Sequence, residues 1–413
     1  MKQNVKKKSY RRCLTILIIM CMLIAMTRHK ILDAEANDIG VLSRDQMIEN
    51  AYYPEDYSGY RFPVLPGTTN WPYGDYSVMI STCKIPERNL ESMTTEELLQ
   101  TVLVHPLIYN VYAYDSVYEG YDAVKQCIDC LQELCLRPDR TTCLYNYVSA
   151  HADLLATPTE KTGDAYIDFL IRKPRAILFL LAESEDFFNE EIKSSGAALA
   201  EINRRLKEDR KTDDKEVRDL YPLEFHRVVG PANGAFERTV HNVHGYAMDG
   251  LQYQAAEEWL YNNGMYYVRY FNEYSDYAKA DMTSNIYGVF GISPISGYGP
   301  TIEYNCHSYA WNNDYKYTCW VDVFKSNGFT ETTFASVAIG GNVVYYQSSG
   351  GAVGSNTPYV HSAVVYSKTY QSGYNILLKS KWGSCGVYVH SISNCPYYMY
   401  DETTPRDRKY FNP

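Results

Sequence analysis

The sequence predicts an α+β fold, with an N-terminal all-helical domain followed by a domain in which one helix packs on an antiparallel β-sheet. Between residues 91 and 212, apolar residues recur at helical spacing. From residue 321 onward, short alternating runs of apolar and polar residues are separated by Gly, Asn and Ser. Cys306 opens a short helical pattern ahead of this sheet, and His361 opens one of its apolar strands. This order of patterns is typical of a helix that packs on a sheet.

Residues 1–36 predict a signal peptide or a membrane anchor. Lysines and arginines in the first twelve residues precede an apolar run from Cys13 to Met26. That run suits the core of a signal peptide and is short for a spanning helix, which needs about 20 residues. Ala34-Glu35-Ala36 offers a small-residue cleavage site, and an uncleaved anchor is the alternative. In both cases we expect the rest of the chain to be secreted or displayed at the cell surface.

The expected exported part is acidic. The whole chain has a formal net charge of -10, and residues 1–36 carry eight basic and two acidic side chains, so the remainder has a charge of about -16. This balance argues against a general nucleic-acid surface, and we expect membrane contact only through an uncleaved N-terminal segment. Tyrosine occurs 41 times, which favours β-structure and half-buried surfaces.

Composition divides the remaining chain into four segments. Residues 37–90 are rich in Tyr, Pro and Gly and predict an extended segment without a core of its own. Thr94 and Glu97 form a capping-box pattern, so a helix is expected to start the helical domain of residues 91–212 there. Residues 213–294 predict a linker and a mixed α/β segment, and residues 295–413 predict the domain that carries Cys306 and the antiparallel sheet.

Nine cysteines follow the leader, and an odd number in an exported chain suggests that one thiol stays free. If Cys306 is the free thiol, eight remain to form disulfides. Four of these follow one another at short spacing, which favours disulfides over reduced thiols or a zinc or iron–sulfur site: Cys127, Cys130, Cys135 and Cys143. The pair His241 and His244 has ligand-like spacing but no third ligand at a recognisable offset.

Cys306 is the candidate nucleophile and His361 the candidate general base. Asn305 is expected to cap the helix that Cys306 opens, and a thiol in the first helical turn is favoured as thiolate by the macrodipole. The oxyanion would meet the Cys306 N–H and Asn305, with His307 lining the pocket.

A third group is needed to orient His361. A hairpin turn at residues 370–373 would place His361 on the same face of the sheet as Ser380 and Trp382. Ser380 would then hydrogen-bond the imidazole and Trp382 would shield it, with His390 on the next strand as the rival third member.

At this point the chain resembles the papain-like cysteine peptidase and amidase superfamily. The resemblance rests on Cys306, on the His strand His361-Ser362-Ala363-Val364-Val365, and on Ser380-Lys381-Trp382-Gly383, where Ser380 stands in the place of the family's Asn. Over about residues 295–400 the chain is also similar to uncharacterised secreted proteins of Gram-positive bacteria, distantly related to NlpC-type cell-wall hydrolases. The resemblance implies a thiol protease or amidase.

The sequence therefore predicts a secreted cysteine hydrolase that cleaves peptide or peptidoglycan stem-peptide amide bonds through an acyl-enzyme. This chemistry requires no metal and no organic cofactor. One alternative is a non-catalytic extracellular binding module with a Tyr-rich surface. Another is a transglutaminase-like transferase, which normally uses Asp as its third residue.

Overall fold

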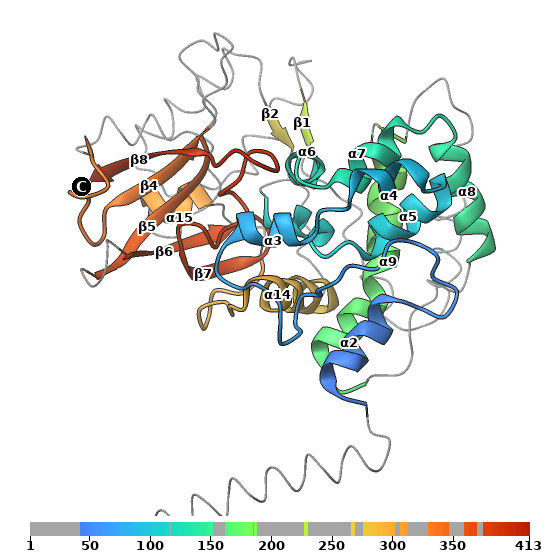
Figure 1. Ribbon diagram of the computed structural model, residues 1–413. Coiled ribbons are helices and arrows are strands. Elements are labelled where there is room, and N and C mark those ends of the chain that lie inside the picture. The colour runs from blue at the N-terminus through green and yellow to red at the C-terminus, as the bar shows by residue number, and fades with distance from the viewer. Residues whose placement is uncertain are drawn as a thin grey trace, which may run out of the picture. The chain divides into compact units, whose positions relative to one another are not determined.

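The computed structural model describes residues 42–114, 117–151, 162–184, 186–187, 227–229, 266–268, 276–301, 306–312, 329–346, 359–369 and 375–413. The chain divides into two compact units, Met1–Glu49 and Asn50–Pro413. The boundary falls within helix α2 (Arg44–Tyr52), and the second unit holds all the other elements (Figure 1). Among the described helices, none is both long and apolar enough to cross a membrane. The predicted leader, residues 1–36, lies outside the described residues.

The predicted capping box at Thr94 is confirmed. The Thr94 hydroxyl accepts the N–H of Glu97, and the Glu97 carboxylate accepts the N–H of Thr94 at 2.7 Å, so two N–H groups at the start of α5 (Thr95–Val104) are satisfied. Further helices follow in chain order: η1 (Ile108–Ala113), α6 (Val117–Lys125), α7 (Asp129–Leu136), α8 (Arg140–Ala150) and α9 (Ala165–Glu183).

Helix α9 packs against α14 (Asp276–Phe290), which lies in the segment expected to be a linker and mixed structure. Met282, Ile286 and Phe290 of α14 are buried, and Asp281 forms a buried ion pair with Arg172 of α9. This helix therefore belongs to the core of the molecule. The same segment contributes the two-stranded pair of β1 (Arg227–Val229) and β2 (Tyr266–Val268).

The segment of residues 37–90 is not simply extended, and this prediction was wrong. It contains α2, α3 (Tyr76–Thr82) and α4 (Glu87–Ser92), with turns and irregular chain between α2 and α3. Asp75 caps α3 by accepting the N–H of Ser77 at 2.9 Å, a start signal that the Pro and Gly content obscured. Tyr76 and Met79 are buried, so this segment contributes to the core.

The second half of the chain forms a six-stranded antiparallel sheet with the order β3-β8-β4-β5-β6-β7. Its strands are β3 (Thr330–Thr332), β4 (Asn342–Tyr346), β5 (Tyr359–Thr369), β6 (Asn375–Trp382), β7 (Gly386–Ser391) and β8 (Asp407–Asn412). Helices and an antiparallel sheet together confirm the α+β class, whereas a papain-like arrangement is not established by them.

The register of β5 and β6 determines which side chains share a face. Val364 pairs with Lys379 and Val365 with Leu378, and the register shifts after Val365. Continuing the unshifted register places Trp382 opposite His361, on the shared face that the hairpin predicted. Buried apolar residues gather on the face that carries Val365 and Leu378: Val337, Val343, Tyr345, Ala363 and Ile376.

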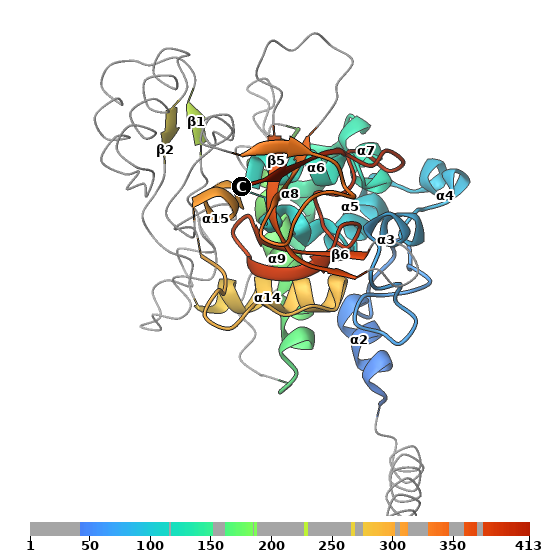
Figure 2. The ribbon, with the colours of Figure 1, turned by 90° about the vertical axis from the view of Figure 1, so that its left-hand side faces the viewer.

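The two faces of the sheet have different covers. Helix α15 (Cys306–Asn312) packs on β5 and β6, and its Trp311 contacts Phe411 of β8 at a ring distance of 5.4 Å (Figures 1 and 2). On the other face, Trp382 contacts Phe290 of α14 at 4.9 Å. The segment after β7 lies against the helical region there, since Tyr76 donates its N–H to the Ser393 carbonyl at 2.8 Å.

Candidate functional site

Cys306 is the first residue of α15, as expected, and is buried. The expected N-cap Asn305 lies outside the described residues. The next residue, His307, is 4 % exposed, and its Nδ1 lies 2.8 Å from the hydroxyl of Ser362 on β5. Trp311, one helical turn further on, donates its indole N–H to the same hydroxyl at 2.9 Å.

His307, Trp311 and Ser362 form a hydrogen-bonded group on the α15 face of the sheet. Together with Cys306, the buried residue that directly precedes His307, we call them the α15-side cluster. The Ser362 oxygen has two lone pairs, so it can accept both the Trp311 N–H and an N–H from His307. In that tautomer the lone pair of His307 lies on Nε2. An imidazole and an orienting hydroxyl therefore occur together on this face, and a thiol is carried by the residue next to the imidazole in sequence.

His361 lies on the opposite face. Side chains alternate along a strand, and Ser362 points toward α15, so its neighbour His361 points away from it. Within the described structure, neither ring nitrogen of His361 has a hydrogen-bond partner. The predicted pairing of Cys306 as nucleophile with His361 as general base is therefore not formed, because a one-residue step along β5 changes the face of the sheet.

Ser380 also has a different partner from the one expected. Its hydroxyl lies 2.7 Å from Nε2 of His390 on β7, and the Trp382 indole N–H donates to it at 3.0 Å. His390 Nδ1 donates to the Ser391 carbonyl at 2.8 Å, which leaves the lone pair on Nε2 to accept the Ser380 proton. Ser380 thus orients His390 instead of His361, and the two expected rivals form one network.

The ring of His361 is held by aromatic side chains. It stacks on Tyr397 with a centroid distance of 4.0 Å and an interplanar angle of 11°, and Tyr345 lies at 5.5 Å. Burial lowers the pKa of His361 well below its usual value, and the neighbouring His390, His307 and Arg406 lower it further. Burial also lowers the pKa of His390 to about 4. Both imidazoles are therefore neutral at pH 7.

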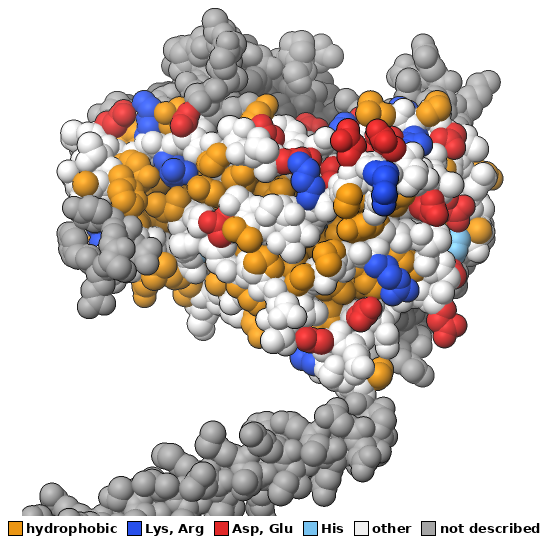
Figure 3. All heavy atoms as spheres, in the orientation of Figure 1, with side chains coloured by type: hydrophobic (Ala, Val, Ile, Leu, Met, Phe, Trp, Pro, Cys, Tyr) orange, Lys and Arg blue, Asp and Glu red, His pale blue; other side chains and the backbone are white. Residues whose placement is uncertain are grey.

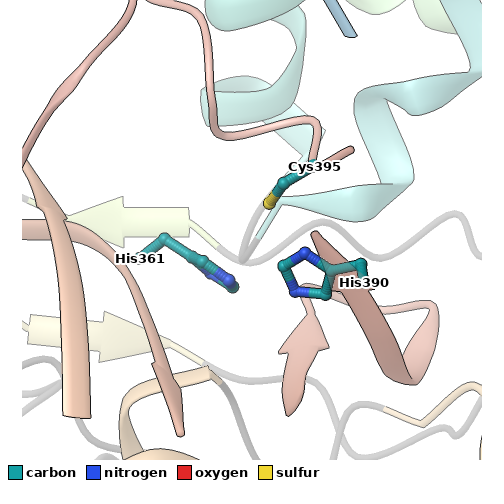
Figure 4. Close-up of side chains that lie close together, drawn as sticks. All are labelled: His361, His390 and Cys395. Atoms are coloured by element: carbon teal, nitrogen blue, oxygen red, sulfur yellow. The ribbon is translucent and has the colours of Figure 1, made fainter. Parts of the chain in front are cut away.

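Cys395 also belongs to this site, although no sequence pattern pointed to it. Its Sγ and one ring nitrogen each of His361 and His390 all lie within 4.8 Å of one another. Figure 4 shows the two rings next to each other, with the sulfur directed toward the space between them. We call this second group the Cys395 cluster: His361, Ser380, Trp382, His390 and Cys395. The only signal in the sequence was a cysteine five residues after His390, which is weak by itself.

The four closely spaced cysteines of the helical region are free thiols in the structure, so the predicted disulfides among them are not present. Cys130 is fully buried in α7, whereas Cys135 and Cys143 are partly exposed. The His361, His390 and Cys395 trio is the only group of three or more potential metal ligands found within the described residues, so these four cysteines do not form one. His241 and His244 lie outside the described residues.

Comparisons with protein-family models, with curated proteins and with solved structures found no match. The functional proposals below therefore rest on the geometry and on the sequence.

Proposed function

We propose that the protein is an exported cysteine hydrolase that cleaves amide bonds of peptides or peptidoglycan stem peptides, with Cys306 as the nucleophile. The observation that carries the proposal is the α15-side cluster. Nucleophilic cysteine catalysis needs a thiol, an imidazole to take its proton and a third group that holds the imidazole. Cys306, His307 and Ser362 supply these three groups from one helix and the strand beneath it.

In this proposal His307 replaces His361 as the general base. Ser362 accepts the Nδ1–H of His307, so Nε2 is the atom that takes the proton from the Cys306 thiol. The thiolate attacks the amide carbonyl carbon, and the oxyanion meets N–H groups at the start of α15, where helix geometry provides no partner within the helix. The imidazolium then protonates the leaving amine, and water hydrolyses the acyl-enzyme.

Helix geometry works against a close contact between the Cys306 thiol and the His307 imidazole. Consecutive helical residues point about 100° apart, so Cys306 and His307 are neighbours in sequence without sharing a helix face. The anchoring of His307 by Ser362 supports the proposal because it removes the freedom of the ring to turn toward solvent. The identity of the base is thus the part that an experiment must test first.

Alkylation of the full-length protein with iodoacetamide between pH 5 and 8, mapped by mass spectrometry, tests both points. We expect rapid labelling of Cys306 at pH 6, loss of that labelling in His307→Ala, and its retention in His361→Ala. An ordinary thiol with a pKa of about 8.5 would label slowly at pH 6, and that result would reject the nucleophile. Loss of labelling in His361→Ala alone would reject His307 as the base.

A second candidate, a non-catalytic binding module, is favoured by the complete burial of Cys306. Large exposed tyrosines are Tyr73, Tyr145, Tyr287 and Tyr366. Figure 3 shows the hydrophobic side chains of one face in several separate places among charged ones. Slow labelling of Cys306 at every pH would favour this class, and the four tyrosines would then be the first positions to substitute in a search for a ligand.

A further inference from the structure

The Cys395 cluster contains a buried polar group without a partner. A neutral imidazole has one N–H donor and one acceptor nitrogen. His361 is 0 % exposed, and neither of its ring nitrogens has a hydrogen-bond partner within the described structure. Leaving such a group unsatisfied in the interior is costly, so it calls for an explanation. A bound ion that accepts the lone pair of one nitrogen is one such explanation.

The neighbours of His361 are the side chains that a transition metal requires. We propose that His361, His390 and Cys395 bind a single Zn²⁺-class ion. The three residues are each at most 2 % exposed, and they come from β5, from β7 and from the segment that follows β7. The three ligands come from separate elements and converge on one buried point among apolar side chains. Such an arrangement is a preformed site in the interior, in contrast to a chance cluster of side chains at the surface.

The donor set determines the class of ion. Two imidazole nitrogens and one thiolate suit Zn²⁺, which binds nitrogen and sulfur ligands in tetrahedral geometry. Mg²⁺ and Ca²⁺ prefer oxygen ligands, and the trio supplies none. In a tetrahedral zinc site the ligand atoms are about 3.3 to 3.6 Å apart. The present separations, up to 4.8 Å, would therefore close by about 1 Å when the ion binds.

The hydrogen bonds of His390 fit a ligating histidine. Histidine ligands usually donate their second ring N–H to a carbonyl or carboxylate, which determines the tautomer. His390 donates Nδ1–H to the Ser391 carbonyl, so Nε2 is the ligating atom. Ser380 now hydrogen-bonds that nitrogen and would give it up when the ion binds, while its oxygen keeps the N–H of Trp382. Ser380 is thus a competitor for Nε2.

The binding step releases one proton. The thiol of Cys395 ligates as thiolate, so the S–H bond breaks, an S–metal bond forms and the proton leaves to solvent. Both imidazoles ligate in their neutral form and release none. Three protein ligands leave a fourth tetrahedral position for water or another small ligand. The site is separate from the proposed nucleophile, because the two clusters lie on opposite faces of the sheet.

Titration of the full-length, reduced protein with Co²⁺, followed by Zn²⁺ competition, tests the proposal. We expect one ion per chain, thiolate-to-cobalt charge-transfer absorption and the visible bands of a tetrahedral site. Cys395→Ser and His361→Gln should lose these bands or weaken binding at least 100-fold. Cys385→Ser is the matched control, because Cys385 is an equally buried free thiol outside the trio. His307→Gln controls for a histidine on the other face.

Two further measurements keep the test decisive if a variant fails to fold. X-ray absorption of Zn²⁺ bound to the wild-type chain should give one sulfur and two imidazole ligands. Ser380→Ala should bind the ion at least as tightly as the wild type, because the competing hydrogen bond is removed. Absence of a 1:1 complex, equal binding by Cys395→Ser, or a zinc shell with two or more sulfurs would overturn the proposal.

Discussion

The two faces of the sheet carry the same local network, in which a serine hydroxyl accepts a tryptophan N–H and contacts a histidine nitrogen. In the α15-side cluster the serine is Ser362, and in the Cys395 cluster it is Ser380. The histidine distances are nearly equal, 2.8 and 2.7 Å. The networks differ in the origin of the thiol: Cys306 directly precedes the histidine in the chain, whereas Cys395 comes from a separate segment after β7.

The chemistry available to a Trp–Ser–His network therefore depends on the position of the thiol and on whether a second imidazole is present. One imidazole near one thiol offers acid–base chemistry. Two neutral imidazoles around one thiol offer a donor set for a metal. His361 is the second imidazole of the Cys395 cluster. It belongs to that cluster because its side chain points from β5 to the face of the sheet opposite α15. Four experiments test the roles of the two clusters and the stability of the structure around them.

The largest expected effect is on hydrolysis. Cys306→Ala should lower the rate of amide hydrolysis by about 10³-fold or more, because no other group replaces the attacking sulfur. Release of new amines from purified peptidoglycan and from denatured protein substrates measures this rate. Cys385→Ala, a matched buried thiol, should keep the wild-type rate. Equal loss in both variants would show that the two thiols are needed only for folding.

The helical region contains a pH-dependent element. Lys173 of α9 is buried, its ammonium donates to the Val104 and His105 carbonyls, and burial lowers its pKa to about 7. The unfolded chain, with a pKa of about 10.4, binds more protons than the folded chain between pH 7 and 10. Lys173 should therefore contribute stability that rises with pH in this window, by about 4 kcal/mol.

Urea unfolding at pH 7, 8 and 9 measures this slope, provided that the transition is two-state. The contribution of Lys173 is the difference between the wild-type slope and the Lys173→Met slope, because buried thiols such as Cys83, whose pKa burial raises, lower stability as the pH rises. A slope of the same size in Lys173→Met would assign the dependence to other groups.

The junction between the sheet and the helical region depends on a glycine. Gly383 has φ +42, and a Cβ there would lie 2.0 Å from the Tyr114 carbonyl oxygen. Gly383→Ala should therefore lower the free energy of unfolding by about 2 to 3 kcal/mol or more. Gly340→Ala is the control, since its φ is +84 but no atom lies within 4 Å, and it should cost only about 1 kcal/mol. Thermal unfolding compares the two.

The smallest effects separate the two serines. Ser362→Ala and Ser380→Ala should each lower the free energy of unfolding by about 1 to 3 kcal/mol, because each leaves a buried indole N–H and an imidazole nitrogen without a partner. Only Ser362→Ala should also slow the alkylation of Cys306 at pH 6. If Ser380→Ala slows it equally, the two faces act as one site and the comparison fails.

Much of the fold could be predicted from local patterns. The capping box at Thr94, helix α9 and the strands around Val343, Val387 and His361 follow from side-chain periodicity and caps. These signals act over a few residues, so they are readable without knowledge of the fold. The helix α3 was missed because its cap, Asp75, lies in a stretch where Pro and Gly dominate.

Local sequence patterns were sufficient to place Cys306 at the start of a helix and His361 on a buried strand. They also predicted that β5 and β6 pair near the observed register. Which of these side chains contact one another depends on the tertiary structure. Ser362, not His361, faces α15, because alternate side chains of a strand point to opposite faces and the helix covers only one of them. Cys395 joins two histidines through chain folding alone, which no local spacing encodes.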